Sequence, residues 1–284
     1  RIDRPKSHCT AFGFTPDSKR LAYLTAIDEG RDHILRLADA TDGHAIGKEL
    51  REPNGNTFSN SHALAFSPDG KRLAVGTAYN ADTPNGWKTQ ILRWEVARDG
   101  TEFRKINPLP RTNGMAKDMR FAPDGDQLLA VTGTSAVVGW SWATGQEDLR
   151  TDYPELITDL VAVGKSHAAA GAWVPASLQA TVADWRLDPK ASGPAESNPP
   201  MFPVALASVA FSPDDSLLAA GTKGLANIPW EQLAAVHIWE RQTGGERAVL
   251  LGHADWVLDV AFTPDGKKLV SASKDGTVRT WRLP

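Results

Sequence analysis

Short runs of alternating apolar and polar residues, separated by turn residues, make up most of the chain. Leu258, Val260 and Phe262 alternate before one such turn, and Leu269 resumes the pattern after it. Alternation of this kind is typical of half-buried β-strands, and no long segment shows the 3.6-residue period of an amphipathic helix. We therefore expect an all-β chain built from hairpins.

One phrase recurs and divides the chain into repeats. Pro in its second turn position presets φ for a type I turn, Ser or Thr before it can bond to the turn backbone, and Gly suits the fourth position. The phrase therefore predicts a tight turn between two strands. Its copies are FTPDSKRL from Phe14, FSPDGKRL from Phe66, FAPDGDQL from Phe121, FSPDDSLL from Phe211 and FTPDGKKL from Phe262.

The number of repeats follows from the spacing. Phe121 and Phe211 are 90 residues apart, about two periods, so we expect a degraded copy between them, with Val163 in the aromatic position. A β-branched residue followed three positions later by Trp ends the third strand in five repeats, and room remains for a fourth strand. This predicts six four-stranded antiparallel meanders, with cores near residues 5–50, 57–108, 112–150, 156–190, 202–251 and 252–284.

A single twisted four-stranded sheet cannot bury both of its faces. Radial stacking of such sheets solves the problem and leaves few exposed edges. We expect one domain over residues 1–284, with a row of separate small β domains as the alternative.

The last repeat reads GHADWVLDVAFTPDGKKLVSASKDGTVRTW from Gly252 to Trp281 and resembles a WD-repeat (WD40) protein. The resemblance covers essentially the whole chain and implies a WD40-type β-propeller with six blades visible. This chain departs from the family pattern in two ways. Only its last repeat has the Gly-His pair, and none of its repeat tryptophans is followed by Asp. The last blade also lacks its outer strand, so we expect the chain to be cut from a longer protein, whose ring could hold seven or more blades.

The same resemblance implies a structural role for four polar residues of the last repeat. In the family, residues in the places of His253, Ser271, Asp275 and Trp281 form a buried hydrogen-bond chain that braces the blade. Ser, His and Asp could also suggest a hydrolase triad. No nucleophile elbow and no evident oxyanion hole accompany them, so we expect a brace and no enzyme.

Four tryptophans lie outside the packing pattern and form a candidate binding surface. The second-to-third strand connections contain insertions near residues 28–32, 79–88, 174–179 and 224–233, which all project from one face of a propeller. Exposed tryptophans on a loop-rich rim are favoured anchors for partners, although such residues can also pack the loops on themselves. These tryptophans are Trp87, Trp173, Trp230 and Trp256.

Positions equivalent to Trp256 are expected to ring the mouth of the central channel. That ring is mostly uncharged, which suits a peptide, and includes His8, Asn60, Met115, Leu156 and Ala205. Below it, Asp118, Asp159 and Asp259 are expected at matching positions, where three carboxylates could bind a divalent cation. Water and backbone amides more often hold such groups, so we predict no metal and no cofactor.

Charge and cysteine content narrow the range of partners. The chain has 31 Lys and Arg against 34 Asp and Glu, a net charge of −3, and no basic run. This gives no electrostatic reason to bind nucleic acid or an anionic membrane. Cys9 is the only cysteine, so no internal disulfide forms, which favours a reducing, cytoplasmic compartment.

These observations predict a protein-protein interaction scaffold or sensor module of a larger bacterial regulatory protein. Its partner is a protein or peptide bound on the inserted-loop face, and the full-length chain carries an effector domain. Two alternatives stay open, namely a propeller enzyme with a channel metal site and a purely structural half of a double propeller.

Overall fold

The computed structural model describes residues 8–27, 32–51, 63–80, 87–97, 102–133, 136–152, 157–164, 167–174, 179–186, 205–223 and 234–283. These residues form strands and turns, and no helix occurs among them. The chain divides into two compact units, unit 1 (Arg1–Arg150) and unit 2 (Thr151–Pro284).

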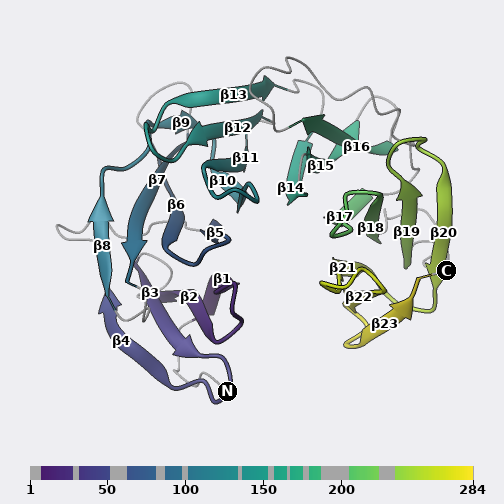
Figure 1. Cartoon of the computed structure of the whole chain (residues 1–284), viewed down its shortest axis with the longest axis horizontal. Coiled ribbons are helices and arrows are strands. Elements are labelled where there is room, and N and C mark those ends of the chain that lie inside the picture. The colour runs from purple at the N-terminus through teal and green to yellow at the C-terminus, as the bar shows by residue number, and fades with distance from the viewer. Residues whose placement is uncertain are drawn as a thin grey trace. The chain divides into compact units, whose positions relative to one another are not determined.

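Unit 1 contains three antiparallel sheets, one for each of the first three repeats. The first has the order β1 (His8–Phe14), β2 (Arg20–Ile27), β3 (Asp32–Asp39) and β4 (Ala45–Leu50). The second is β5 (Ala63–Phe66), β6 (Arg72–Asn80), β7 (Trp87–Val96) and β8 (Phe103–Ile106). The third is β10 (Ala116–Phe121), β11 (Gln127–Thr132), β12 (Ala136–Ser141) and β13 (Glu147–Asp152). The first strands β1, β5 and β10 lie side by side (Figure 1).

Unit 2 contains the sheets of the last three repeats. The fourth sheet is β14 (Ile157–Val163), β15 (His167–Val174) and β16 (Gln179–Arg186). The fifth is β17 (Ala205–Phe211), β18 (Leu217–Lys223), β19 (Ala235–Glu240) and β20 (Glu246–Leu251). The sixth is β21 (Val257–Phe262), β22 (Lys268–Ser273) and β23 (Val278–Arg282), without an outer strand in the described residues, as the sequence predicts.

The recurring phrase forms the turn between the first and second strands. In the second repeat the amide of Gly70 donates to the carbonyl of Ser67 at 2.8 Å, and the same bond closes the turns at Ser18, Gly125, Asp215 and Gly266. The fourth turn residue has positive φ in every copy, which Gly adopts without strain. Ser18 and Asp215 adopt it with φ of 57° and 62° as non-glycine residues. The same hydrogen-bonded turn therefore forms in all five copies, and in two of them a non-glycine residue adopts a strained positive φ.

The aromatic residue before each turn packs against the preceding sheet. Phe66 contacts the apolar cluster that joins the first and second sheets, and Phe121 belongs to the cluster that joins the second and third. The repeat tryptophans pack in the same clusters, with Trp140 and Trp239 0% and 2% exposed. Phe14 has no preceding sheet within unit 1 and is 53% exposed. The sheets thus bury each other's faces, as the repeat pattern predicts.

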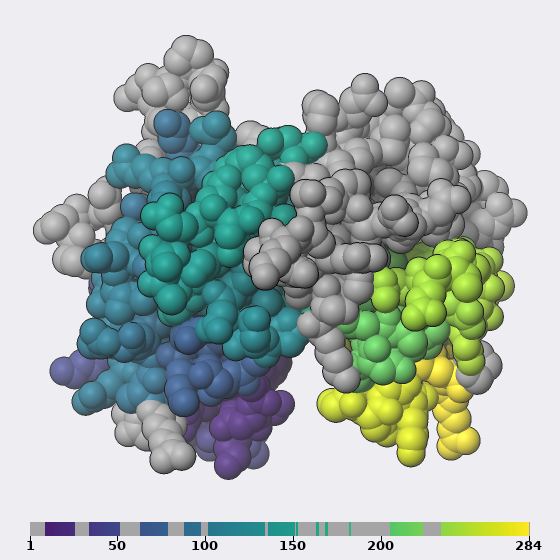
Figure 2. Space-filling view, turned by 45° about the horizontal axis from the view of Figure 1, so that its top comes forward, coloured from purple at the N-terminus to yellow at the C-terminus, as the bar shows by residue number. Residues whose placement is uncertain are grey.

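The space-filling view shows this stacking within each unit. In Figure 2 the purple, blue and teal residues of unit 1 form one continuous mass. The green and yellow residues of β17–β23 in unit 2 likewise lie against one another, and the apolar cluster of Val236, Val257 and Leu269 fills the space between their sheets.

A β-bulge recurs four residues before the aromatic position, and it corrects one expectation. The pairing shifts between Ala116 and Asp118 and between Val257 and Asp259, so both aspartates follow a bulge and pair normally. In the fourth sheet the shift falls between Thr158 and Leu160, which makes Asp159 the bulged residue itself. The expectation that Asp159 matches the other two aspartates is therefore wrong, because the bulge offsets it by one position.

Two expected loop tryptophans lie in strands. Pairing between β6 and β7 continues to Asn80 and Trp87, and a short strand, β9 (Thr112–Asn113), adds to β7 beside Lys88. Trp173 lies in β15 and pairs with Ile157 and Ala180. The inserted residues extend the hairpin ladder because continued pairing satisfies backbone amides and carbonyls that a loop would leave to solvent.

Candidate functional site

The last repeat holds a chain of polar side chains from four separate segments. His253 precedes β21, Ser271 lies in β22, Asp275 follows β22, and Trp281 lies in β23. His253 Nδ1 is 2.9 Å from Asp275 Oδ2 and His253 Nε2 is 2.7 Å from Ser271 Oγ. The Trp281 indole donates to Ser271 Oγ at 2.8 Å. The structure therefore brings together the four residues that the family resemblance groups.

The Ser271 hydroxyl links the two halves of this network. Because a carboxylate accepts hydrogen bonds, His253 Nδ1 donates to Asp275, and we assign Nε2 as the acceptor of the Ser271 hydroxyl. The same hydroxyl oxygen accepts from Trp281, so each polar group is satisfied within the blade. Ser271 is only 1% exposed, which places its oxygen out of reach of a substrate carbonyl. This geometry suits a brace and not a catalytic nucleophile.

Asp275 fixes the segment that leads into the last repeat. The Thr277 hydroxyl donates to its Oδ1 at 2.6 Å and the Ala254 amide donates to its Oδ2 at 2.9 Å. These two bonds, followed by the one from His253, hold the pKa of Asp275 far below its usual range. The ionised carboxylate therefore ties residues 253–254 to the turn after β22.

Next to this anchor lies a small exposed surface, which we call the entrance patch (Asp255, Trp256 and Lys274). Trp256 is 37% exposed, and Lys274 Nζ lies 4.3 Å from the centre of its ring in a cation–π contact. The Lys274 amide donates to the Trp256 carbonyl at 2.9 Å, and Asp255 Oδ1 accepts from the Trp256 amide at 2.7 Å. Ser273 Oγ donates to the Asp255 carbonyl at 2.8 Å. Trp256 is thus an exposed aromatic side chain on a backbone fixed at several points.

The other predicted partner-binding residues are only partly covered by the described residues. His8 begins β1, and Met115 precedes β10, half-buried, with its carbonyl accepting from the Gly133 amide at 2.7 Å. For Trp87 and Trp173 the structure describes the backbone in β7 and β15 and not the side chain. Asn60 and Trp230 lie outside the described residues. Trp256 is therefore the predicted partner-binding residue that the structure describes in most detail.

The expected channel carboxylates are engaged by neighbouring donors. Asp118 Oδ1 accepts from Arg120 Nη1 at 2.6 Å and from the Met119 amide at 2.8 Å. Asp259 Oδ1 accepts from Ser208 Oγ at 2.7 Å, which joins the fifth and sixth sheets of unit 2. The described residues contain no group of three or more His, Cys, Asp or Glu side chains placed to hold a metal ion.

Sequence and structure comparisons agree with the repeat pattern. The family profile "WD domain, G-beta repeat" matches residues 244–282. Coronin-7 of Mus musculus is 36% identical over 90 residues, which make up 28% of this chain and 10% of that protein. WD repeat and SOCS box-containing protein 1 of Danio rerio is 39% identical over 74 residues, or 26% of this chain and 15% of that protein. The match therefore spans a small part of each of these relatives.

A solved structure shows the fold over nearly the whole chain. A chain in the crystal structure of a mitotic checkpoint complex, a WD40 propeller, superposes on 98% of this chain and 78% of its own length, with a TM-score of 0.72 and 15% identity. In the residues that the structure describes, no helix has the length and apolar character needed to cross a membrane. The chain has a β-propeller fold with a WD repeat at residues 244–282, and WD40 propellers generally act as protein-interaction scaffolds.

Proposed function

We propose that this propeller captures a protein or peptide partner at the face that carries the entrance patch. The supporting observation is Trp256, a partly exposed aromatic residue whose backbone is held by Asp255 and Lys274. Tryptophan is enriched among residues that dominate binding energy, and a side chain ordered before binding loses little entropy on contact. Lys274 beside the ring adds a positive charge that would favour an acidic residue near the partner's apolar contact.

The propeller serves as the addressing or sensing module of a larger regulatory protein and performs no chemical step itself. The relatives that match are much longer than the matched segments, which supports a multidomain parent protein. We extend the proposal to a bacterial cytoplasmic protein with a linked effector domain. For the compartment, the support is the single exposed Cys9, which suits a reducing environment. The partner is a protein and not a nucleic acid, since the net charge is −3.

Affinity purification from the source cells with the 284-residue chain as bait tests this function. Trp256→Ala should remove the recovered partners, and Lys274→Ala should reduce their recovery. Leu251→Ala is the matched control, because Leu251 is an apolar side chain, 64% exposed on the outer strand β20 of the same unit. Equal recovery with Trp256→Ala and Leu251→Ala would remove the entrance patch from the binding surface.

A further inference from the structure

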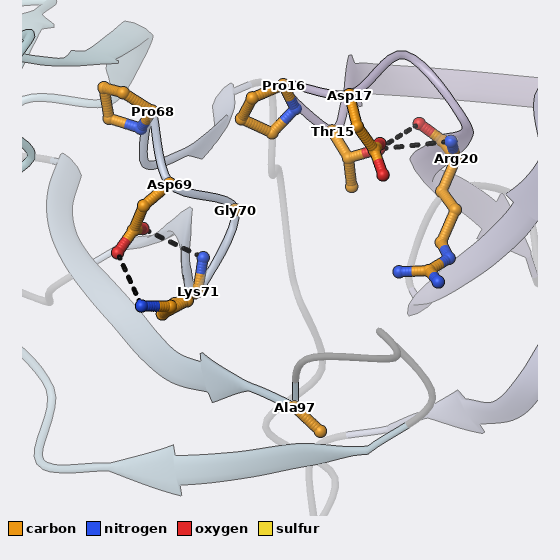
Figure 3. Close-up of a pocket in the computed structure, with 9 residues that line it drawn as sticks. All are labelled: Thr15, Pro16, Asp17, Arg20, Pro68, Asp69, Gly70, Lys71 and Ala97. Atoms are coloured by element: carbon orange, nitrogen blue, oxygen red, sulfur yellow. Dashed lines mark hydrogen bonds and ion pairs between the residues drawn. The ribbon is translucent and has the colours of Figure 1, made fainter.

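A pocket of about 520 Å³ opens between the turns of the first and second repeats in unit 1 (Figure 3). These turns join first and second strands, so the pocket lies at the opposite end of the sheets from the second-to-third strand connections. Its lining combines two prolines with two cationic and two acidic side chains. The lining residues are Thr15, Pro16, Asp17, Arg20, Pro68, Asp69, Gly70, Lys71 and Ala97.

The two acidic side chains of the pocket are engaged by their own turns. Asp17 Oδ1 accepts from the Thr15 hydroxyl at 2.6 Å and from the Lys19 amide at 3.1 Å. Asp69 Oδ1 accepts in the same way from the Ser67 hydroxyl at 2.6 Å and the Lys71 amide at 3.0 Å. Each carboxylate therefore stabilises its turn, and an acceptor oxygen of each is already engaged there.

The two cationic side chains are much less engaged. Lys71 Nζ lies 3.9 Å from Asp69 Oδ2, at the outer limit of an ion pair. Within the described part of the chain the Arg20 guanidinium has no hydrogen-bond or ion-pair partner, and Figure 3 shows it extending from its turn toward the open space. The pocket thus presents two positive charges with unused donors.

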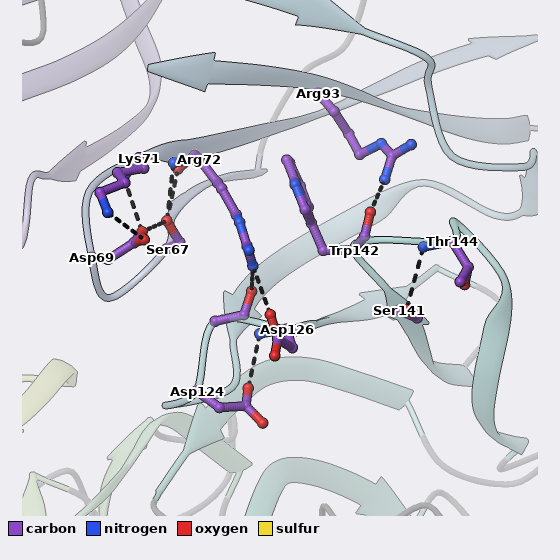
Figure 4. Close-up of polar contacts among 11 residues, drawn as sticks. Ser67, Asp69, Lys71, Arg72, Arg93, Asp124, Asp126, Ser141, Trp142 and Thr144 are labelled. Atoms are coloured by element: carbon purple, nitrogen blue, oxygen red, sulfur yellow. Dashed lines mark hydrogen bonds and ion pairs between the residues drawn. The ribbon is translucent and has the colours of Figure 1, made fainter. Parts of the chain in front are cut away.

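The next junction along unit 1 shows one way of filling this position. The second and third copies of the turn phrase align Arg72 with Arg20, and Asp126 with Lys71. Arg72 Nη1 donates to the Gly125 carbonyl and lies 3.1 Å from Asp126 Oδ1, which closes the junction between the second and third turns (Figure 4). At the first junction Lys71 stands where this carboxylate would be. Figure 3 shows the Lys71 amine turned toward Asp69, so the Arg20 guanidinium meets no carboxylate across this junction and the junction stays open.

We propose that this pocket binds the carboxylate of a glutamate or aspartate side chain in a peptide segment of a partner protein. The carboxylate would take the place that Asp126 takes at the next junction and accept charge-assisted hydrogen bonds from Arg20 and Lys71. Pro16 and Pro68 would contact the apolar parts of the neighbouring peptide residues. This site is separate from the entrance patch and does not depend on it.

NMR titration of the full chain tests the site, with the Arg20 Nε–H and the Gly70 and Lys71 amides as reporters. The probes are acetyl-Leu-Glu-Leu-amide, its Gln counterpart and inorganic phosphate. The Glu peptide should cause saturable shifts, and the Gln peptide should bind at least about tenfold more weakly, since a charged hydrogen bond is lost. Arg20→Gln and Lys71→Asp should weaken Glu-peptide binding by a similar factor. Lys19→Gln, beside the pocket but outside its lining, is the control and should change affinity less than about twofold.

Three results would overturn the assignment. The first is the absence of saturable shifts with the Glu peptide, and the second is equal binding of the Glu and Gln peptides. The third is unchanged affinity in Lys71→Asp, in which an internal carboxylate should occupy the Arg20 guanidinium. Phosphate binding as tight as that of the Glu peptide would define a general anion site and likewise end the peptide proposal.

Discussion

Removing the Ser271 hydroxyl should loosen the last sheet, because this oxygen bonds to two other side chains of the network. Ser271→Ala takes one partner from His253 Nε2, which is buried, and one from the indole of Trp281, which is partly exposed. A buried group without its hydrogen bond costs about 1–3 kcal/mol, and a group near water costs less. The two losses together should lower the free energy of opening of this sheet by about 2–4 kcal/mol.

Native-state hydrogen exchange of β22 and β23 measures this change directly. Since about 1.4 kcal/mol is a tenfold change in an equilibrium constant, their amides should exchange roughly 30- to 1000-fold faster in Ser271→Ala. Trp281→Phe provides a matched background, because it lacks the indole N–H. In the Trp281→Phe background, the loss of opening free energy caused by Ser271→Ala should be about 1 kcal/mol smaller than in the unmodified chain. A change under about threefold in the first variant, or an equal cost in both backgrounds, would refute the brace.

Three further predictions concern the turns. Ser18→Gly should raise the free energy of unfolding in urea titrations by about 0.5–1 kcal/mol, since Gly adopts the φ of 57° at this position without strain. Gly70→Ala should lower the free energy of unfolding by a similar amount. Changes of the opposite sign would contradict this. The hydroxyls of Ser212 and Ser216, with the Ser216 amide, lower the pKa of Asp214 to about 2. Its unfolded value is about 3.9, so its contribution is present above about pH 4 and lost as pH falls through about 2. Asp214→Asn should therefore flatten the acid limb of a stability–pH profile, and an unchanged limb would count against it. Asp126→Lys should lower the free energy of unfolding by about 0.5–1 kcal/mol, because it opens the second junction. An unchanged free energy of unfolding would show that the ion pair does not stabilise the fold.

Most of the fold could be predicted because the same turn phrase occurs five times. The turn phrase fixes both the hairpin and its register, and the aromatic residue before it has one apolar surface to meet, which is the preceding sheet. The exposure of Phe14 and the burial of Phe121 follow from the same rule. The position of Ser271 in β22 is held by Val75, Ala130 and Ala220 in other repeats, so only the last repeat could show the polar brace in its sequence.

The sequence was less informative where one repeat contacts the next. The repeat pattern assigns no role to Trp142, yet this residue is buried, with its ring centre 5.1 Å from that of Phe121. Arg93 lies over its ring at 5.0 Å and donates to its carbonyl (Figure 4). Such contacts depend on which residues face each other across two sheets, and alternation within one strand does not reveal them. The open junction at Arg20 is visible in the sequence only as a difference between aligned phrases, which have Lys71 in one copy and Asp126 in the next. The meaning of that difference depends on which turns face each other across the two sheets.

The proposal that this propeller binds partners through the entrance patch is tested most directly by site-specific photo-crosslinking. The photoreactive amino acid p-benzoylphenylalanine would replace Trp256 in one variant and the exposed Leu251 in another, and each chain would be irradiated in its source cells. We predict a reproducible crosslinked polypeptide from position 256 and none from position 251. The absence of a crosslink at position 256, or the same polypeptide crosslinked from both positions, would contradict the proposal.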